Sequence, residues 1–250
     1  MRYDPSQPEM VPVLFFTLFL SVVGFILTFK LINKWKKRKV FETLYLSLVF
    51  AFLVIGATSL SIGLLEAIIT GYRKEIYMFT LPLAYCCVVV ADIFLFVFAS
   101  HITNSEKNAI IPITVIGICL IIVIFLPWNW WGQPAERYAG KPSIRTYTSF
   151  GFVIYSCIIY IAIAIICLRT KKIAEKKVTR TGLSLLFYSV MSMIGFFIMI
   201  MCDNLMITIY HNPGYTIFNI IAWIFAILFV ILSYLSLIMP NWLVKKIEKK

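Results

Sequence analysis

Residues 11–39 read VPVLFFTLFLSVVGFILTFKLINKWKKRK, an apolar run that leads directly into a basic cluster. The apolar part, 11–31, has about the 20 residues that a helix needs to cross a hydrocarbon core of roughly 30 Å. Lysine and arginine in short loops are retained in the cytoplasm, so the cluster also predicts on which side the run ends. The stretch therefore predicts an oriented transmembrane helix.

Six further runs of the same kind follow in the chain. The seven expected spans are 11–31, 42–65, 76–101, 109–127, 147–168, 182–207 and 215–239. The overall composition, 61% hydrophobic and 14% charged, excludes an ordinary soluble domain. The sequence thus predicts a single all-α domain over 1–250, an integral membrane seven-helix bundle in the cell membrane.

Positive charge alternates between the loops that join these spans. Of the 23 basic residues, 17 lie after the first, third and fifth spans and in the C-terminal tail. The opposite side holds Arg2, Arg73, Lys74, Arg137, Lys141 and Arg145. We therefore expect the N-terminus outside and the C-terminus in the cytoplasm, and an odd number of spans requires such opposite ends.

The net charge of +12 is concentrated in the clusters that flank the spans. Such clusters attract the anionic headgroups of the inner leaflet. We expect that lipid surface as a partner, with a cytoplasmic or membrane protein as a further one, and no nucleic acid.

Ionisable side chains inside a span are costly and mark candidate sites. Asp92 lies deep in the third span, and its neighbours at helical spacing are apolar. Its carboxyl therefore needs a partner from another helix or must be neutral. Two interpretations stay open: a hydrogen bond that joins two helices, and a site for an ion, a proton or a ligand.

A second group of polar residues belongs to the outer halves of four spans. It consists of Glu66, Arg73, Asp203, Asn204, Tyr210 and Asn219. Helices two, three, six and seven must meet within a seven-helix bundle, so these side chains can line an outward-facing cavity. The alternative is that several of them face the headgroup zone and are hydrated.

The second span carries small residues on one face. Gly56, Ser59 and Gly63 follow one another at three- and four-residue steps, which permits close helix approach. Pro82 in the third span removes one backbone hydrogen bond and predicts a kink.

Catalytic and metal-binding patterns are missing from the sequence. All six cysteines fall within expected spans, so neither a disulfide framework nor a CxxC metal site is predicted. No HExxH, GxSxG or P-loop pattern occurs. We expect no metal and no cofactor, and the sequence favours a protein that is not an enzyme without deciding the point.

Residues 73–83 read RKEIYMFTLPL, which resembles the third helix of microbial rhodopsins, where an arginine is followed by an aromatic residue and then Phe-Thr-x-Pro-Leu. In the sixth span, Tyr188-Ser189-Val190 is similar to the retinal pocket of that family. The resemblance implies a rhodopsin-like seven-helix fold and adds Tyr188 to the candidate ligand-binding residues.

The chain departs from that family where the chromophore would be attached. No lysine lies between Arg180 and Lys245, although the Schiff-base lysine belongs midway along the seventh helix. Ile76 stands in place of the counter-ion carboxylate and Cys87 in place of the usual proton donor. Covalent retinal is therefore excluded. The closing residues 233–243 also resemble the end of the seven-helix sensor heads of archaeal membrane kinases.

These observations favour a receptor- or sensor-like protein without covalent retinal, which binds a small or lipidic ligand or a membrane partner. The alternatives are a small secondary transporter that uses Asp92 as its coupling carboxylate, and a structural subunit of a membrane complex.

Overall fold

The computed structural model describes residues 3–103, 107–130, 144–210 and 214–248. Its long helices are α1 (Met10–Arg38), α2 (Phe41–Thr70), α3 (Glu75–Thr103), α4 (Lys107–Phe125), α5 (Arg145–Ile173), α6 (Lys177–Tyr210) and α7 (Ile217–Ile238). A 3-10 turn, η1 (Pro127–Asn129), follows α4, and a short helix, α8 (Asn241–Glu248), follows α7. Among the described residues, seven of these helices are long and apolar enough to cross a membrane, which confirms the predicted number of long apolar helices.

Several helices extend beyond their apolar runs. α1 continues from the expected end at residue 31 through the basic cluster to Arg38. Lysine and arginine are good helix formers, so a helix need not stop where its hydrophobicity does. Lys39 caps this helix: its N–H donates to the Trp35 carbonyl oxygen, and its left-handed backbone (φ 55°) turns the chain away from the helix.

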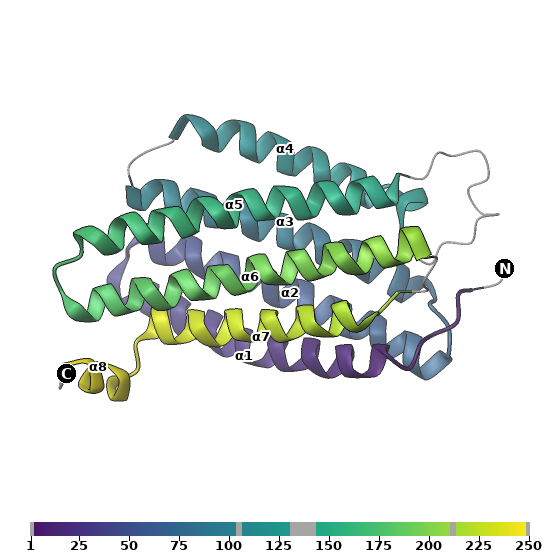
Figure 1. Cartoon of the computed structure of the whole chain (residues 1–250), viewed down its shortest axis with the longest axis horizontal. Coiled ribbons are helices and arrows are strands. Elements are labelled where there is room, and N and C mark those ends of the chain that lie inside the picture. Colours follow the sequence, from purple (N-terminus) through teal and green to yellow (C-terminus); the bar gives the residue numbers. More distant parts are fainter. Residues whose placement is uncertain (1–2, 104–106, 131–143, 211–213, 249–250) are drawn as a thin grey trace.

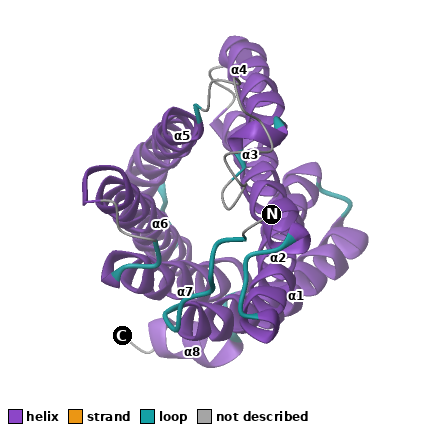
Figure 2. Ribbon diagram, turned by 90° about the vertical axis from the view of Figure 1, so that its right-hand side faces the viewer, coloured by secondary structure: helices purple, strands orange, loops and turns teal. Residues whose placement is uncertain are grey.

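Six of the long helices form a closed ring. Each helix of the ring contacts the next one in the order α1, α2, α3, α5, α6 and α7, and α7 contacts α1 to close the ring. The end-on view shows this ring, with α4 outside it against α3 and α5 (Figure 2). The helices run along the long axis of the molecule, and the two chain ends lie at opposite ends of the bundle (Figure 1).

The predicted small-residue face of α2 packs against α3. A Cβ atom added at Gly63 would lie 2.0 Å from Thr80 Oγ1 and 3.0 Å from Tyr77 Cα. One added at Gly56 would lie 3.2 Å from the Ala84 carbonyl oxygen. Two helices approach this closely only where side chains are absent, so the prediction of close packing is confirmed.

Hydroxyl groups join α6 to α7 at the end of the bundle opposite the N-terminus. Ser189 Oγ lies 2.9 Å from the Phe229 carbonyl oxygen, and Ser236 Oγ lies 2.8 Å from that of Gly182. Both hydroxyls donate across the helix pair. Interhelical hydrogen bonds of this kind replace the hydrophobic attraction that lipid does not provide.

Substitution at Gly63 tests the α2–α3 contact. We expect Gly63→Ala to lower the free energy of unfolding by about 1–3 kcal/mol, because the new methyl group overlaps Thr80 and the α3 backbone. Gly151→Ala in α5 is the matched control, since its added Cβ meets Leu120 Cδ2 at an ordinary 3.6 Å. Thermal unfolding in detergent measures both variants, and equal midpoints would contradict the contact.

Candidate functional site

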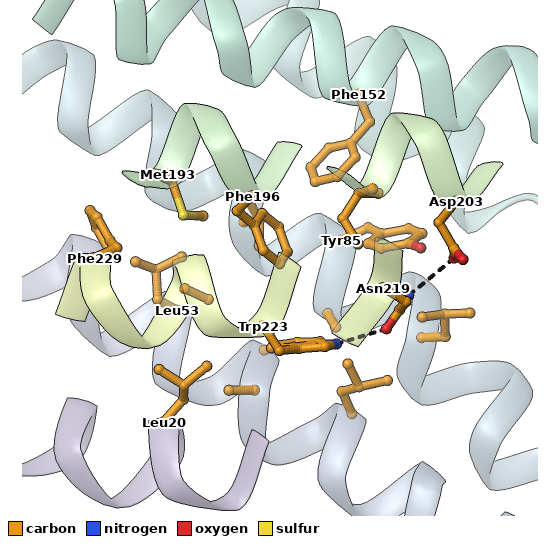
Figure 3. Close-up of a pocket in the computed structure, with 18 of the residues that line it drawn as sticks. Leu20, Leu53, Tyr85, Phe152, Met193, Phe196, Asp203, Asn219, Trp223 and Phe229 are labelled. Carbon is orange, nitrogen blue, oxygen red and sulfur yellow. Dashed lines mark hydrogen bonds between the residues drawn. The ribbon is translucent and has the colours of Figure 1, made fainter. Parts of the chain in front are cut away.

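A cavity of about 180 Å³ lies inside the ring of helices (Figure 3). All six ring helices contribute to its lining, and α4 does not. One buried water needs only about 10–15 Å³ of such space, so this cavity has room for a ligand. Mainly apolar cavities between the helices of a bundle are among the preferred places for ligand sites.

The larger part of the cavity is apolar and elongated. Leu20 of α1, Leu53 of α2, Met193 of α6 and Phe229 of α7 line it (Figure 3). Along α6 the lining runs from Met193 to Ile207, which at about 1.5 Å per residue corresponds to roughly 20 Å. The cavity, polar end included, therefore has the length for an elongated, mainly apolar molecule.

One end of the cavity is polar and is organised by Asp203. The buried carboxylate accepts hydrogen bonds from Thr216 N at 2.9 Å, Thr216 Oγ1 at 2.7 Å and Asn219 Nδ2 at 3.1 Å. Asn219 Oδ1 in turn accepts from the indole of Trp223 at 3.0 Å (Figure 3). This series of hydrogen bonds joins α6 to the start of α7 and to the Trp223 ring, which lines the cavity.

Arg73 lies at the same end of the cavity. Its guanidinium carbon is 5.9 Å from the ring centre of Tyr77 and 5.7 Å from that of Tyr215. The two tyrosine hydroxyls are 2.6 Å apart and hydrogen-bond to each other. The cation is thus held against two aromatic rings, a favourable arrangement for a buried arginine.

Glu66 stabilises this end without lining the cavity. Its Oε2 accepts a hydrogen bond of 2.8 Å from the backbone N–H of Tyr77. The first N–H groups of a helix have no partner within it, and Glu66 supplies one to α3. Its carboxylate therefore positions the turn that carries Tyr77.

The N-terminal segment crosses the turn between α2 and α3. Ser6 N donates to the Gly71 carbonyl oxygen at 2.9 Å, and Arg73 N donates to that of Asp4 at 2.9 Å. The Tyr3 hydroxyl donates to the Glu75 carboxylate. These bonds fix the backbone from which the Arg73 side chain extends.

Asp92 occupies a different place, the contact between α3 and α5. It is fully buried, and its Oδ2 accepts a hydrogen bond of 2.6 Å from Ser156 Oγ. The Tyr160 hydroxyl lies near the same carboxyl. The expected partner from another helix is thus found, and Asp92 is not part of the cavity lining.

The structure brings together four of the seven predicted site residues. Arg73, Asp203, Asn204 and Asn219 line the cavity, and Glu66 supports its wall. Asp92 is separate from them. Tyr188 and Tyr210, the latter from the predicted outer cluster, are 59% and 70% exposed and lie away from the cavity.

Among the lining residues that sequence reasoning missed are Tyr77, Tyr85, Tyr215 and Trp223. Two of them could have been predicted from spacing. Tyr77 follows Arg73 by four residues, and Trp223 follows Asn219 by four, so helical spacing predicts each on the same face as a predicted site residue. Tyr215 precedes α7 with a left-handed backbone (φ 54°), and no helical periodicity predicts its direction.

No known protein family matches the chain, and searches of curated proteins and of solved structures yield no match. The function must therefore be inferred from the residues of this chain.

The Asp92–Ser156 hydrogen bond can be tested by removing its donor. We expect Ser156→Ala to lower the free energy of unfolding by about 1 kcal/mol, because a buried acceptor loses its partner. Ser192→Ala is the control, since Ser192 Oγ donates only to the Tyr188 carbonyl oxygen of its own helix. Chemical unfolding in micelles measures both, and equal stabilities would contradict an interhelical role for Asp92.

Proposed function

We propose that this chain is a receptor- or sensor-like seven-helix membrane protein that binds a small or lipidic ligand noncovalently within the ring of helices. The observation that carries the proposal is the cavity itself. It combines a long apolar body with a polar end built from side chains of α3, α6 and α7. A few placed polar groups in an apolar pocket are typical of ligand sites.

We place the N-terminal end of the bundle, and with it the polar end of the cavity, on the outer side of the cell membrane. The support is the charge distribution, with 17 of 23 basic residues assigned to the opposite side. In this orientation an external ligand enters next to Arg73, Tyr77 and Tyr215. The signal would then pass along α6 and α7 to the basic inner end.

At the inner end, α8 is suited to lie along an anionic surface. Its basic residues Lys245 and Lys246 accompany an exposed Trp242, while Ile247 is buried. Basic amphipathic segments bind inner-leaflet headgroups. The same basic end is where we propose that a cytoplasmic or membrane protein partner docks.

We further propose that the chain is a relative of the microbial rhodopsins that does not bind retinal covalently. The lining of the cavity contains no lysine among the described residues, so a Schiff base cannot form there. A ligand must be held by packing and hydrogen bonds alone.

The transporter alternative is less well supported, because it requires a coupling carboxylate that substrate or ions can reach. Asp92 lies in the α3–α5 contact, outside the cavity lining. A carboxyl bonded between two helices acts first as an interhelical link. We therefore favour ligand binding.

Filling the cavity tests the proposed function. We expect the purified wild-type protein to carry a co-purifying small molecule in near-stoichiometric amount, and Leu53→Trp to lose it, because the indole occupies the apolar body. Leu65→Trp is the matched control. The Leu65 side chain of α2 is 48% exposed, so we expect this variant to keep the co-purifying molecule. Mass spectrometry of solvent extracts measures this. A profile shared by all three proteins would contradict ligand binding in the cavity.

The proposed orientation has its own test. We expect an epitope tag at the N-terminus to be accessible to antibody on intact cells, and a tag at the C-terminus only after permeabilisation. The reverse pattern would overturn the orientation, and equal access at both ends would overturn the odd number of spans.

A further inference from the structure

The charges that line the cavity balance one another. Among the described residues the lining contains one basic side chain, Arg73, and one acidic side chain, Asp203. Arg73 rests against two tyrosine rings, and the Asp203 carboxylate accepts three hydrogen bonds. A charged ligand would bring an uncompensated charge into this space, and burial of an unpaired charge is strongly unfavourable. The lining therefore favours an uncharged ligand.

Asn204 offers a polar group that is not used elsewhere in the described structure. It lines the cavity beside Asp203 and is only 7% exposed. Its neighbours Asp203, Asn219 and Trp223 bond to one another, whereas no hydrogen bond to the Asn204 side-chain amide is found among the described residues. The Asn204 amide lines the cavity and is therefore available to a bound group that pairs with it, and such a hydrogen bond stabilises the complex.

The chemistry of an amide defines the group that can pair with it. Asn204 presents a carbonyl oxygen that accepts and an NH₂ that donates. A hydroxyl or a primary amide does both and therefore complements it. Tyr85, which also lines the cavity, directs its hydroxyl toward the same polar end (Figure 3), where it adds a second uncharged donor and acceptor.

The apolar part of the cavity defines the rest of the ligand. Aromatic rings of Phe50, Phe152, Phe196 and Phe229 line it. The whole cavity, polar end included, extends over roughly 20 Å along α6, which accommodates an extended amphiphile.

We propose that the ligand is an uncharged amphiphile whose hydroxyl or amide group hydrogen-bonds with Asn204 and whose hydrocarbon body lies between α2, α6 and α7. This inference rests on the proposed function, since it assigns a ligand class to the same cavity.

Two fluorescent probes with the same polyene chain test the inference, parinaryl alcohol and parinaric acid. The full-length protein is placed in nanodiscs at about pH 9, where the acid is a carboxylate, and empty nanodiscs provide the reference. We expect saturable binding of the alcohol at least about tenfold tighter than that of the acid, because the cavity lining holds equal numbers of basic and acidic side chains and a carboxylate would add a net charge. This comparison uses the wild-type protein alone.

The variant Asn204→Leu tests the position of the head group. We expect it to weaken binding of the alcohol by about fivefold, as for the loss of one buried neutral hydrogen bond. Asn108→Leu, the same change at an exposed position of α4 outside the cavity lining, leaves the affinity unchanged.

The outcomes separate this inference from the proposed function. Absence of saturable binding of either probe would overturn the amphiphile, while the co-purification experiment with Leu53→Trp decides the proposed function separately. Binding of the acid as tight as that of the alcohol would overturn the uncharged ligand and leave a ligand-binding cavity. An alcohol affinity that Asn204→Leu does not change would overturn the assignment of Asn204.

Discussion

The three hydrogen bonds to the Asp203 carboxylate are the interaction on which the candidate site depends. A carboxylate inside an apolar bundle is tolerated only when its oxygens are paired. Both donors on Thr216 and the amide of Asn219 provide this pairing, and Thr216 also caps α7 by accepting from the Phe218 N–H. One residue of α6 thereby sets where α7 begins and how Asn219 and Trp223 face the cavity.

The size of the cavity follows from a difference between the two sides of the ring. On the α2–α3 side, small residues such as Gly56 and Ala84 bring the two helices together, and their short side chains extend little into the cavity. On the α6–α7 side, Phe196, Trp223 and Phe229 form a stiff aromatic wall, and the Phe196 and Trp223 rings meet edge to face at 5.6 Å. Small residues opposite rigid rings leave space that side chains of this chain do not fill.

Hydropathy predicted the number of long helices because a chain in lipid must satisfy its backbone hydrogen bonds within each helix. For the polar residues at the outer ends of the spans, the sequence left open whether they line a cavity or face the headgroup zone. Arg73, Asp203, Asn204 and Asn219 line the cavity, whereas Tyr210 is exposed. The order of helices around the ring could not be predicted. Each span is apolar on most faces, so no stripe distinguishes α4, which packs outside the ring, from its neighbours. Tyr188 was expected near the ligand only because residues 188–190 resemble the retinal pocket of another family, and it lies on the exposed surface.

The central claim is that the space inside the ring is a ligand site organised by Asp203. Electron cryo-microscopy of the protein in nanodiscs, purified without added ligand, tests it most directly. The account predicts elongated density of non-protein origin between α2, α6 and α7 that ends beside Asn204, with the Asp203, Thr216 and Asn219 side chains in contact. A ring in which Phe196 and Trp223 have moved inward to fill the space, with no such density, would contradict it.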